Sequence, residues 1–262
     1  MTASSDARVA MVTGSARPWG IGRATALNLA RRGYDIAIVD VRKDWGEDGA
    51  EAISNETGQR VIFVETDVSS RDQVFAMADT VLSTFGRIDA VVNDAAVSGL
   101  SRTEDFTDEQ FHAVIGVNLL GPMLCAQAVV PTMKAANYGR IVNVASTAPY
   151  QPPAGAGVSL YNASKGGLIA WTKSAATELA PYGIVVNVVA VGGLSTGMGR
   201  DEPPTPAQDD HMANVTHRGQ LPWGRVIQAD EAAEVIGYAA SAPNHAMLGA
   251  TIHASGGRVM PL

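Results

Sequence analysis

Apolar runs and helix-like patterns alternate along almost the whole chain. Short runs rich in valine, isoleucine and alanine predict buried strands at 9–13, 35–40, 60–66, 88–92, 140–144, 184–189 and 251–253. Patterns with helical periodicity fall between them, at 21–32, 46–57, 71–85, 108–136, 160–180 and 230–241. Continuous β-branched strands are typical of a parallel sheet that is covered on both faces. The sequence therefore predicts an α/β fold in one domain over 1–262, a doubly wound parallel sheet with helices on both faces.

One stretch, about 192–225, interrupts this alternation. It holds glycine, proline, aspartate, histidine and threonine with little periodicity. A long irregular insertion in a compact domain is usually functional, and this one follows the strand at 184–189. Because open α/β sheets bind ligands beyond the carboxyl ends of their strands, we expect a substrate-binding loop here.

Composition and charge narrow the class of protein. The chain has 262 residues, of which 46% are hydrophobic and 17% charged, so it can bury a large core. A net charge of -7 argues against a general nucleic-acid or anionic-membrane binder. The one cysteine, Cys125, lies in an apolar stretch and is interpreted as a buried hydrophobe. The histidines show no metal-ligand spacing, and no signal peptide precedes the first strand, so we expect a cytoplasmic protein without a metal site.

Three glycines, Gly14, Gly20 and Gly22, join the first predicted strand to the first predicted helix. Glycines at such a position let the backbone approach a pyrophosphate, and the amino end of the helix supplies free N–H groups. Asp40 ends the next strand, twenty residues beyond Gly20, which is the spacing expected for a carboxylate that binds an adenosine ribose. The loop and its acid predict a dinucleotide site.

The same carboxylate bears on the choice of dinucleotide. Asp40 accepts hydrogen bonds from free ribose hydroxyls and repels a 2′-phosphate, which favours NAD over NADP. Arg17 and Arg42 lie close to it in the sequence and have the charge to bind a phosphate. NADP therefore stays open as an alternative.

Tyr161 and Lys165 lie four residues apart in a predicted helix and hence on one face of it. A phenol, with a pKa near about 10, carries protons poorly at neutral pH. A neighbouring ammonium favours the phenolate, and lowering the pKa to about 7 takes roughly 4 kcal/mol. The pair predicts a general acid/base; the alternative is an amphipathic helix with a lysine extended along its surface.

With both motifs in this order, the sequence resembles the short-chain dehydrogenase/reductase family, most of all its 3-oxoacyl-[acyl-carrier-protein] reductase-like subgroup. The resemblance covers roughly residues 7–257. It implies a Rossmann-type fold and an NAD(P)-dependent oxidoreductase that interconverts a secondary alcohol and a ketone by hydride transfer. It also implies a small-molecule alcohol or carbonyl substrate and a homotetramer or homodimer.

The resemblance assigns the site residues position by position. The catalytic residues that it implies are Asn118, Ser146, Tyr161 and Lys165. The cofactor-binding residues that it implies are Gly14, Ile21, Gly22, Asp40, Asp67, Val68, Asn93, Ala95, Tyr161, Lys165 and Thr196. In this scheme the tyrosine moves the proton and the serine orients the substrate oxygen. The lysine supports the phenolate and binds the nicotinamide ribose, and the asparagine holds a water that links the lysine to solvent.

The chain departs from the family pattern at several places. The glycine loop carries two extra residues, which place Pro18 and Trp19 beside the expected pyrophosphate. Asp94 and Ala96 stand where the family usually has asparagine and glycine. The segment between the serine and the tyrosine is longer than usual, so Thr147 is a second candidate for the serine's role.

Two other functions remain as alternatives at this point. The first is a catalytically silent nucleotide-binding regulator on the same fold. The second is an epimerase or dehydratase, which usually has a longer substrate domain than the roughly 34 residues of the loop at 192–225. The substrate itself and the physiological direction of the reaction are not identified by the sequence.

Overall fold

The computed structural model describes residues 7–152, 157–194, 198, 201–211, 221–243 and 246–260. Seven strands form one sheet in the order β3-β2-β1-β4-β5-β6-β7, and every ladder is parallel. The strands are β1 (Val9–Thr13), β2 (Asp35–Asp40), β3 (Val61–Glu65), β4 (Ala90–Asn93), β5 (Gly139–Ser146), β6 (Ile184–Val191) and β7 (Thr251–Ala254). The predicted parallel sheet and its seven strands are confirmed.

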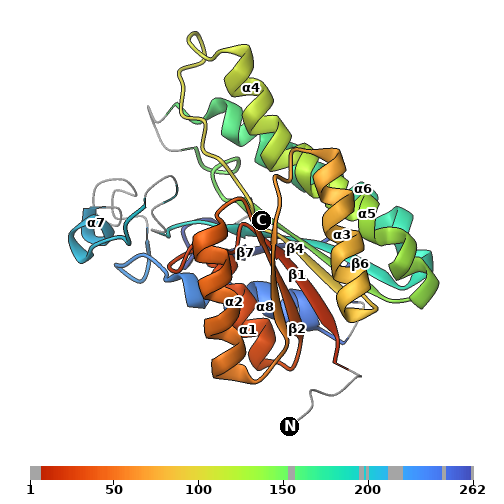
Figure 1. The fold of residues 1–262 in the computed structure, drawn as a ribbon. Helices are drawn as coiled ribbons and strands as arrows, with labels where there is room; N and C mark the ends of the chain where they lie inside the picture. Colours follow the sequence, from red (N-terminus) through yellow and green to blue (C-terminus); the bar gives the residue numbers. More distant parts are fainter. Residues whose placement is uncertain are drawn as a thin grey trace.

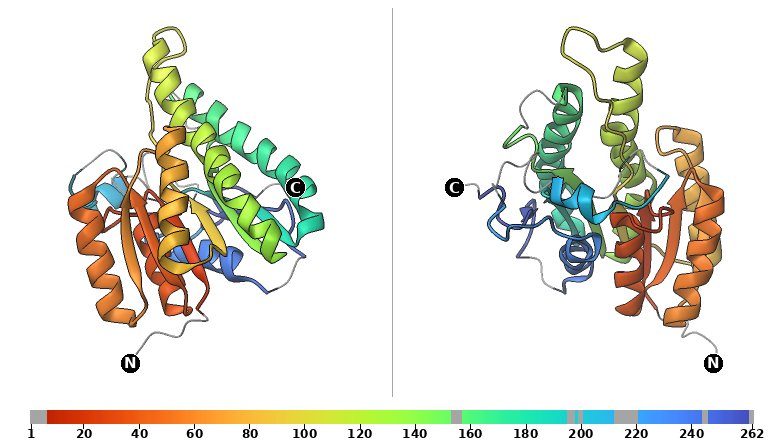
Figure 2. Two further views of the ribbon diagram at one scale, coloured as in Figure 1. Left: turned by 45° about the vertical axis from the view of Figure 1, so that its right-hand side comes forward. Right: turned by 90° about the vertical axis from the view of Figure 1, so that its left-hand side faces the viewer.

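Helices cover both faces of the sheet (Figure 1). One layer consists of α1 (Ile21–Arg31), α2 (Lys43–Thr57) and α8 (Ala229–Ser241), and α1 packs against both of the others. The other layer consists of α3 (Arg71–Phe85), α5 (Gly121–Ala136) and α6 (Ser159–Leu179). The helix α4 (Asp108–Ile115) extends beyond the sheet above this second layer (Figure 2). The predicted loop at 192–225 contains a short helix, α7 (Pro206–His211), which the sequence did not predict.

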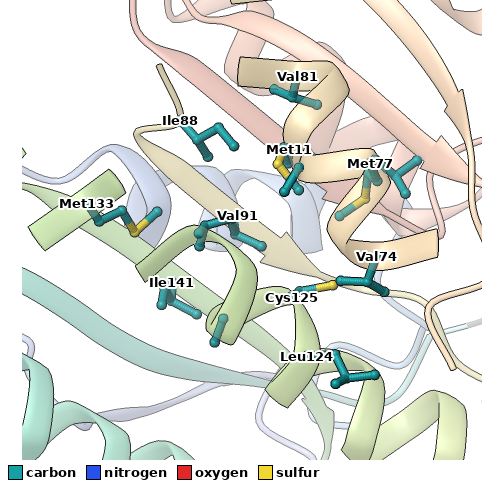
Figure 3. Close-up of a cluster of buried hydrophobic side chains, with 14 of the residues drawn as sticks. Met11, Val74, Met77, Val81, Ile88, Val91, Leu124, Cys125, Met133 and Ile141 are labelled. Atoms are coloured by element: carbon teal, nitrogen blue, oxygen red, sulfur yellow. The ribbon is translucent and has the colours of Figure 1, made fainter. Parts of the chain in front are cut away.

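A hydrophobic cluster holds the sheet to α3 and α5 (Figure 3). Met11 and Val91 of the central strands are fully buried against Met77 of α3 and Met133 of α5. Cys125 lies in the same cluster, and burial raises the pKa of its thiol to about 12. A thiol that is buried and protonated is no nucleophile, so the interpretation of this cysteine as a buried hydrophobe is confirmed.

The long predicted helix at 108–136 is one run with a change of hydrogen-bonding pattern in its middle. Between α4 and α5 lies a π-helical segment, Gly116–Leu120. By length and composition alone the run 108–136 is apolar enough to cross a membrane. Part of its apolar surface is used in packing, because α5 contacts α3, β4 and β5. The π segment matters for function because such segments often occur at functional sites.

The site is positioned by the order of the strands. The chain leaves β1 toward β2 on one side and returns to β4 on the other, so the loops after β1 and β4 diverge at the carboxyl edge. Thr13, the last residue of β1, is in register with Asn93, the last residue of β4. Open α/β sheets bind ligands in the crevice at such a point.

Candidate active site

A cavity of about 380 Å³ opens at this edge of the sheet. Its volume lies in the range of small-molecule and cofactor sites. Six of the predicted cofactor-binding residues line it: Gly14, Ile21, Asp40, Asp67, Val68 and Ala95. Gly22 lies directly behind the wall, and Thr196 lies outside the described residues. The structure thus brings together residues from the ends of β1, β2, β3 and β4.

The glycine loop forms a backbone cradle that fits a diphosphate. Gly14 has a φ of 66°, and a Cβ built there would lie 2.6 Å from the Cα of Ala95. A Cβ on Gly22 would lie 2.4 Å from the carbonyl oxygen of Gly14. Gly20 is the N-cap of α1 and brings no side chain to the first-turn N–H groups. Close backbone approach and open helix N–H groups are what bind phosphate at such loops.

The two extra residues of the loop fold away from the cavity. A turn closes when the N–H of Gly20 donates to the carbonyl of Arg17 at 3.0 Å. Pro18 is exposed at its tip, and the Trp19 ring packs edge-on against Trp45 of α2 with centroids 5.4 Å apart. The insertion is therefore accommodated by an aromatic contact with α2, and the glycines keep their places at the cradle.

Arg23 supports this loop from below, a role that the sequence did not predict. Its guanidinium donates to the carbonyls of Ser15 (3.1 Å), Ala16 (2.5 Å) and Trp45. Room for it comes from Gly49 of α2, where a Cβ would lie 2.0 Å from the guanidinium carbon. The sequence signal for this contact is the two glycines of α2, Gly46 and Gly49. Glycine destabilises the middle of a helix, so two of them there indicate that another group packs closely against the helix.

Asp40 lines the cavity beside Arg42 and Trp45. Its carboxylate accepts hydrogen bonds from the backbone N–H of Ala16 (2.9 Å) and of Arg42 (3.1 Å). The Arg42 guanidinium stacks on Trp45 at 3.8 Å and bonds Asp201 at 3.0 Å. One residue of the predicted substrate loop, Asp201, therefore bonds a residue that lines the cavity.

Asp67 and Val68 follow β3 and form the opposite wall. The Asp67 carboxylate accepts from the backbone N–H of Ser69 at 2.9 Å and from its hydroxyl at 2.7 Å. This short turn fixes the carboxylate at the cavity edge. Val68 is buried and also lines the cavity. Both residues line the cavity, and their contact with adenine stays a prediction.

Tyr161 and Ser146 meet at the end of β5. Ser146 is the last residue of that strand, and its side chain hydrogen-bonds the Tyr161 phenol. The Ser146 hydroxyl also accepts from the backbone N–H of Ala148 at 3.0 Å. A serine and a tyrosine in direct contact fit a site where one group orients a substrate oxygen and the other moves its proton.

Thr147 has a different environment from Ser146. Its side chain is completely buried, and its hydroxyl accepts from the Arg258 guanidinium at 3.0 Å. A Cβ on Gly192 would lie 1.8 Å from that hydroxyl, so no substrate atom fits between them. The geometry favours Ser146 over the alternative.

Lys165 is buried beneath Tyr161. Its ammonium lies 5.9 Å from the centroid of the phenol ring and donates to the carbonyl of Val144 at 2.8 Å. Burial lowers the pKa of this lysine to about 8, and the neighbouring Asp94 opposes that shift. The tyrosine and lysine are thus on one side of α6, as their spacing predicted.

The predicted lowering of the Tyr161 pKa is wrong for this structure. Burial raises the pKa of the phenol to about 12, the hydrogen bond with Ser146 opposes that rise, and the negative charge of Asp94 adds to it. The reason is that the phenolate would be poorly solvated. The ammonium of Lys165, at its 5.9 Å distance and bonded to Val144, does not offset this.

Asn118 lies in the π-helical segment and is completely buried. Its side-chain oxygen accepts from the N–H of Val97 at 2.8 Å, and its amide donates to the carbonyl of Val97 at 2.9 Å and to Ser164 at 3.1 Å. The side chain therefore joins the loop after β4 to α6. The water-holding role that the resemblance implies for this residue stays a prediction.

Asn93, which the resemblance assigns to the cofactor, does not line this cavity, and its contact with a cofactor stays a prediction. It is buried and donates to Asn143 at 2.8 Å, which in turn donates to Thr172 at 2.9 Å. This chain ties β4, β5 and α6 together. Because the side chain of the last strand residue points behind the sheet, the position acts by supporting the site.

Asp94 is the residue of the site whose importance the sequence reasoning missed. It lines the cavity and lies beside Lys165, and its carboxylate accepts from the N–H of Gly22. Its backbone N–H is held by the Thr13 hydroxyl at 3.1 Å. Burial raises the pKa of Asp94 to about 7, which Lys165 partly opposes. The available signal was the acid itself, which replaces the asparagine that is usual in the resembled family.

Comparison with known proteins identifies the family. Residues 8–207 match the short chain dehydrogenase family. A 3-oxoacyl-[acyl-carrier-protein] reductase of Synechocystis sp. is 36% identical over 257 residues, covering 97% of this chain and 98% of that protein. The crystal structure of a short-chain type dehydrogenase/reductase from Mycobacterium marinum superposes with a TM-score of 0.87 at 30% identity, covering 97% of this chain and 96% of that one.

A second solved structure, that of levodione reductase, has a TM-score of 0.85 at 30% identity and covers 96% of this chain and 97% of that one. The chain belongs to the short-chain dehydrogenase/reductase family and to its 3-oxoacyl-[acyl-carrier-protein] reductase-like subgroup. It is an NAD(P)-dependent oxidoreductase that interconverts a secondary alcohol and a ketone. Nothing in the comparisons favours a silent regulator.

Proposed function

We propose that the protein is an NAD-linked dehydrogenase of a small secondary alcohol. The observation that carries this proposal is the Asp40 carboxylate, which lies in the cavity wall and is fixed by two backbone N–H groups. A carboxylate there accepts from the free hydroxyls of an adenosine ribose and repels a 2′-phosphate. The neighbouring cation, Arg42, is paired with Asp44 and Asp201, and these two negative charges weaken its attraction for a phosphate.

The proton chemistry is assigned to the residues that meet at the end of β5. When bound, the nicotinamide ring supplies the group that accepts or returns the hydride. Tyr161 takes the proton of the substrate hydroxyl in oxidation and returns it in reduction. Ser146 donates to the substrate oxygen and holds it near the phenol. Lys165, on the same side of α6 as the phenol, binds the ribose hydroxyls, and Asn118 fixes the loop and helix around them.

The substrate pocket is assigned to the loop at 192–225 together with the segment after Ser146. Support comes from the position of this loop at the carboxyl end of β6 and from Met198, which lines the cofactor cavity. The named activity of the Synechocystis relative suggests a β-keto or β-hydroxy compound as a first class to test.

We further propose that the protein is cytoplasmic and forms a homotetramer or homodimer through α5 and α6. The support is the open face at Gly166, where an added Cβ would meet nothing within 4 Å, so a second helix can approach closely there. Analytical ultracentrifugation tests this directly. A purely monomeric protein at micromolar concentration contradicts the assembly.

The deciding experiment is a pair of binding titrations with NAD and NADP, followed by turnover assays. The assays use sugars, polyols, secondary alcohols and β-ketoesters, with the absorbance of the reduced nicotinamide as the signal. We expect at least tenfold tighter binding of NAD, about 1.4 kcal/mol, since a 2′-phosphate would be placed against a carboxylate. Equal or tighter binding of NADP overturns the argument from Asp40 and leaves the family assignment intact.

A further inference from the structure

Asp94 places a carboxylate between the two ends of the cofactor site. Its backbone is anchored by Thr13 at the end of β1, and its Oδ2 would lie 2.9 Å from a Cβ on Gly22. The carboxylate accepts a hydrogen bond from the backbone N–H of Gly22, which belongs to the first turn of α1. The positive charge of Lys165 acts on it electrostatically and opposes the rise of its pKa. One acidic group thus lies at the helix end suited to a diphosphate and within the electrostatic influence of Lys165.

The charged groups around Asp94 come from three elements. Lys165 and Tyr161 belong to α6, and Asp40 ends β2. On α1, Arg23 donates its hydrogen bonds to the carbonyls of the glycine loop and of α2. Lys165 is therefore the cation that stabilises the ionised form of Asp94, while the negative charges of Asp40 and of a bound diphosphate both destabilise that form.

We propose that Asp94 is a proton-binding group of the cofactor site, which takes up a proton when the dinucleotide binds at the amino end of α1 and releases it when the dinucleotide leaves. The proton comes from solvent and converts the carboxylate to a carboxylic acid. This inference rests on dinucleotide binding, and it holds whichever of the two nucleotides is preferred.

The physical argument is a competition between anions. Burial already raises the pKa of Asp94 to about 7, so near neutral pH the acid is close to half ionised without cofactor. A diphosphate adds negative charge beside the same helix end, and a like charge disfavours the ionised form. The pKa of Asp94 therefore rises further in the complex, and binding is accompanied by proton uptake in the interval between the two pKa values.

The sign of the pH dependence follows. Below about pH 7 the acid already holds its proton, so cofactor affinity is at its highest. As the pH rises through the interval, binding must draw a proton from solvent, and the dissociation constant grows by up to about tenfold per pH unit. Above the pKa of the complex the affinity levels off. Because Asp94 and Lys165 interact, the measured values belong to the pair.

Calorimetric titration with NADH in two buffers of different ionisation enthalpy measures the proton count. NADH is chosen because its nicotinamide carries no positive charge. At pH 8 we expect uptake approaching one proton in the natural protein and a loss of most of that uptake in Asp94→Asn. The control Asp79→Asn removes an exposed carboxylate of α3 and should match the natural protein. Equal uptake in Asp94→Asn and the natural protein overturns the proposal.

Infrared difference spectroscopy identifies the group and needs no variant to fold. On addition of NADH, the natural protein should gain the carbonyl-stretching band of a neutral carboxylic acid, and labelling with carbon-13 aspartate should shift it. Asp94→Asn should lack the band, which also distinguishes Asp94 from titration of Lys165. Binding of NADH without such a band refutes this inference alone. Failure of NADH to bind refutes the dinucleotide site and this inference with it.

Discussion

Replacing Tyr161 with phenylalanine removes one hydroxyl and tests the assigned proton transfer. The ring stays the same, so the packing of α6 should be kept, and the partner that loses a hydrogen bond is Ser146. Ser146 still accepts from Ala148, so its hydroxyl is left with one protein partner. We expect Tyr161→Phe to fold, to bind NAD and to lose nearly all turnover.

The size and pH dependence of the loss follow from the state of the phenol. A positioned general base contributes about 10²–10⁴-fold, so the variant should lose about 3–5 kcal/mol of transition-state stabilisation. Oxidation uses the phenolate, and burial holds the pKa of Tyr161 near about 12 in the structure. The rate of oxidation should therefore rise with pH, by up to about tenfold per unit, until the pH reaches the pKa of the phenol in the complex.

The assay measures kcat for oxidation of the best alcohol from the substrate panel at saturating NAD, from about pH 6 to about pH 10. This range is wide enough to define a slope of about tenfold per pH unit. Tyr182→Phe is the matched control, since Tyr182 lies in the short helix before β6 and contacts Lys134 only through its ring. The control should keep the natural rate and profile. A Tyr161→Phe variant that retains turnover within tenfold, with the same rise with pH, would refute the mechanism.

Three further substitutions test the surroundings of the site. Gly14→Ala should abolish cofactor binding, because its Cβ would meet the Ala95 backbone at 2.6 Å. Gly33→Ala is the control: Gly33 has a φ of 87°, and its added Cβ would meet no atom within 4 Å. This control should lower the free energy of unfolding by only about 1–2 kcal/mol in a thermal-shift assay and should still bind NAD in a titration. Ser146→Ala should lower kcat by about 10²–10³-fold. Thr147→Val should mainly lower the free energy of unfolding, by about 1.5–3 kcal/mol, because it leaves Arg258 without its 3.0 Å hydroxyl partner. A large loss of kcat in Thr147→Val and a small one in Ser146→Ala would assign the serine's role to the threonine. Asp40→Asn should raise the affinity for NADP relative to NAD by at least about tenfold in paired titrations. An unchanged ratio of the two affinities would show that this carboxylate does not determine which nucleotide binds.

Most of the fold was predictable because it depends on local patterns. The strand at 35–40 and the helix at 71–85 have the predicted bounds, since continuous β-branched runs and terminal glycines mark them. The π segment at Gly116–Leu120 was not predictable, because a shift from i+4 to i+5 bonding leaves the apolar pattern of the helix almost unchanged. The helix α7 lies in a segment with few apolar residues, so no periodicity marked it.

The candidate site was predictable in its membership and less so in its contacts. Spacing pointed to Gly14 and Asp40, because strand ends of a parallel sheet must meet at one edge, and the family resemblance pointed to Ser146. The direction of a side chain at such an edge depends on the strand's pleat and on its neighbours, which is why the hydrogen bond from Asn93 to Asn143 was not predicted. The state of the Tyr161 phenol likewise depends on burial, which spacing does not report.

The charges of Asp94, Lys165 and Tyr161 form one system, and this gives the cofactor an influence on the catalytic acid/base. Asp94 raises the pKa of Tyr161 while it is ionised. If cofactor binding makes Asp94 take up a proton from solvent, that influence disappears when the dinucleotide is in place, and the phenol no longer has this negative charge near it. In the pH interval where Asp94 holds its proton in the complex, the rate of oxidation at saturating NAD should then rise with pH in the same way in the natural protein and in Asp94→Asn, because both complexes are neutral at this position. A rise shifted to lower pH in Asp94→Asn within that interval would show that the acid stays ionised during turnover.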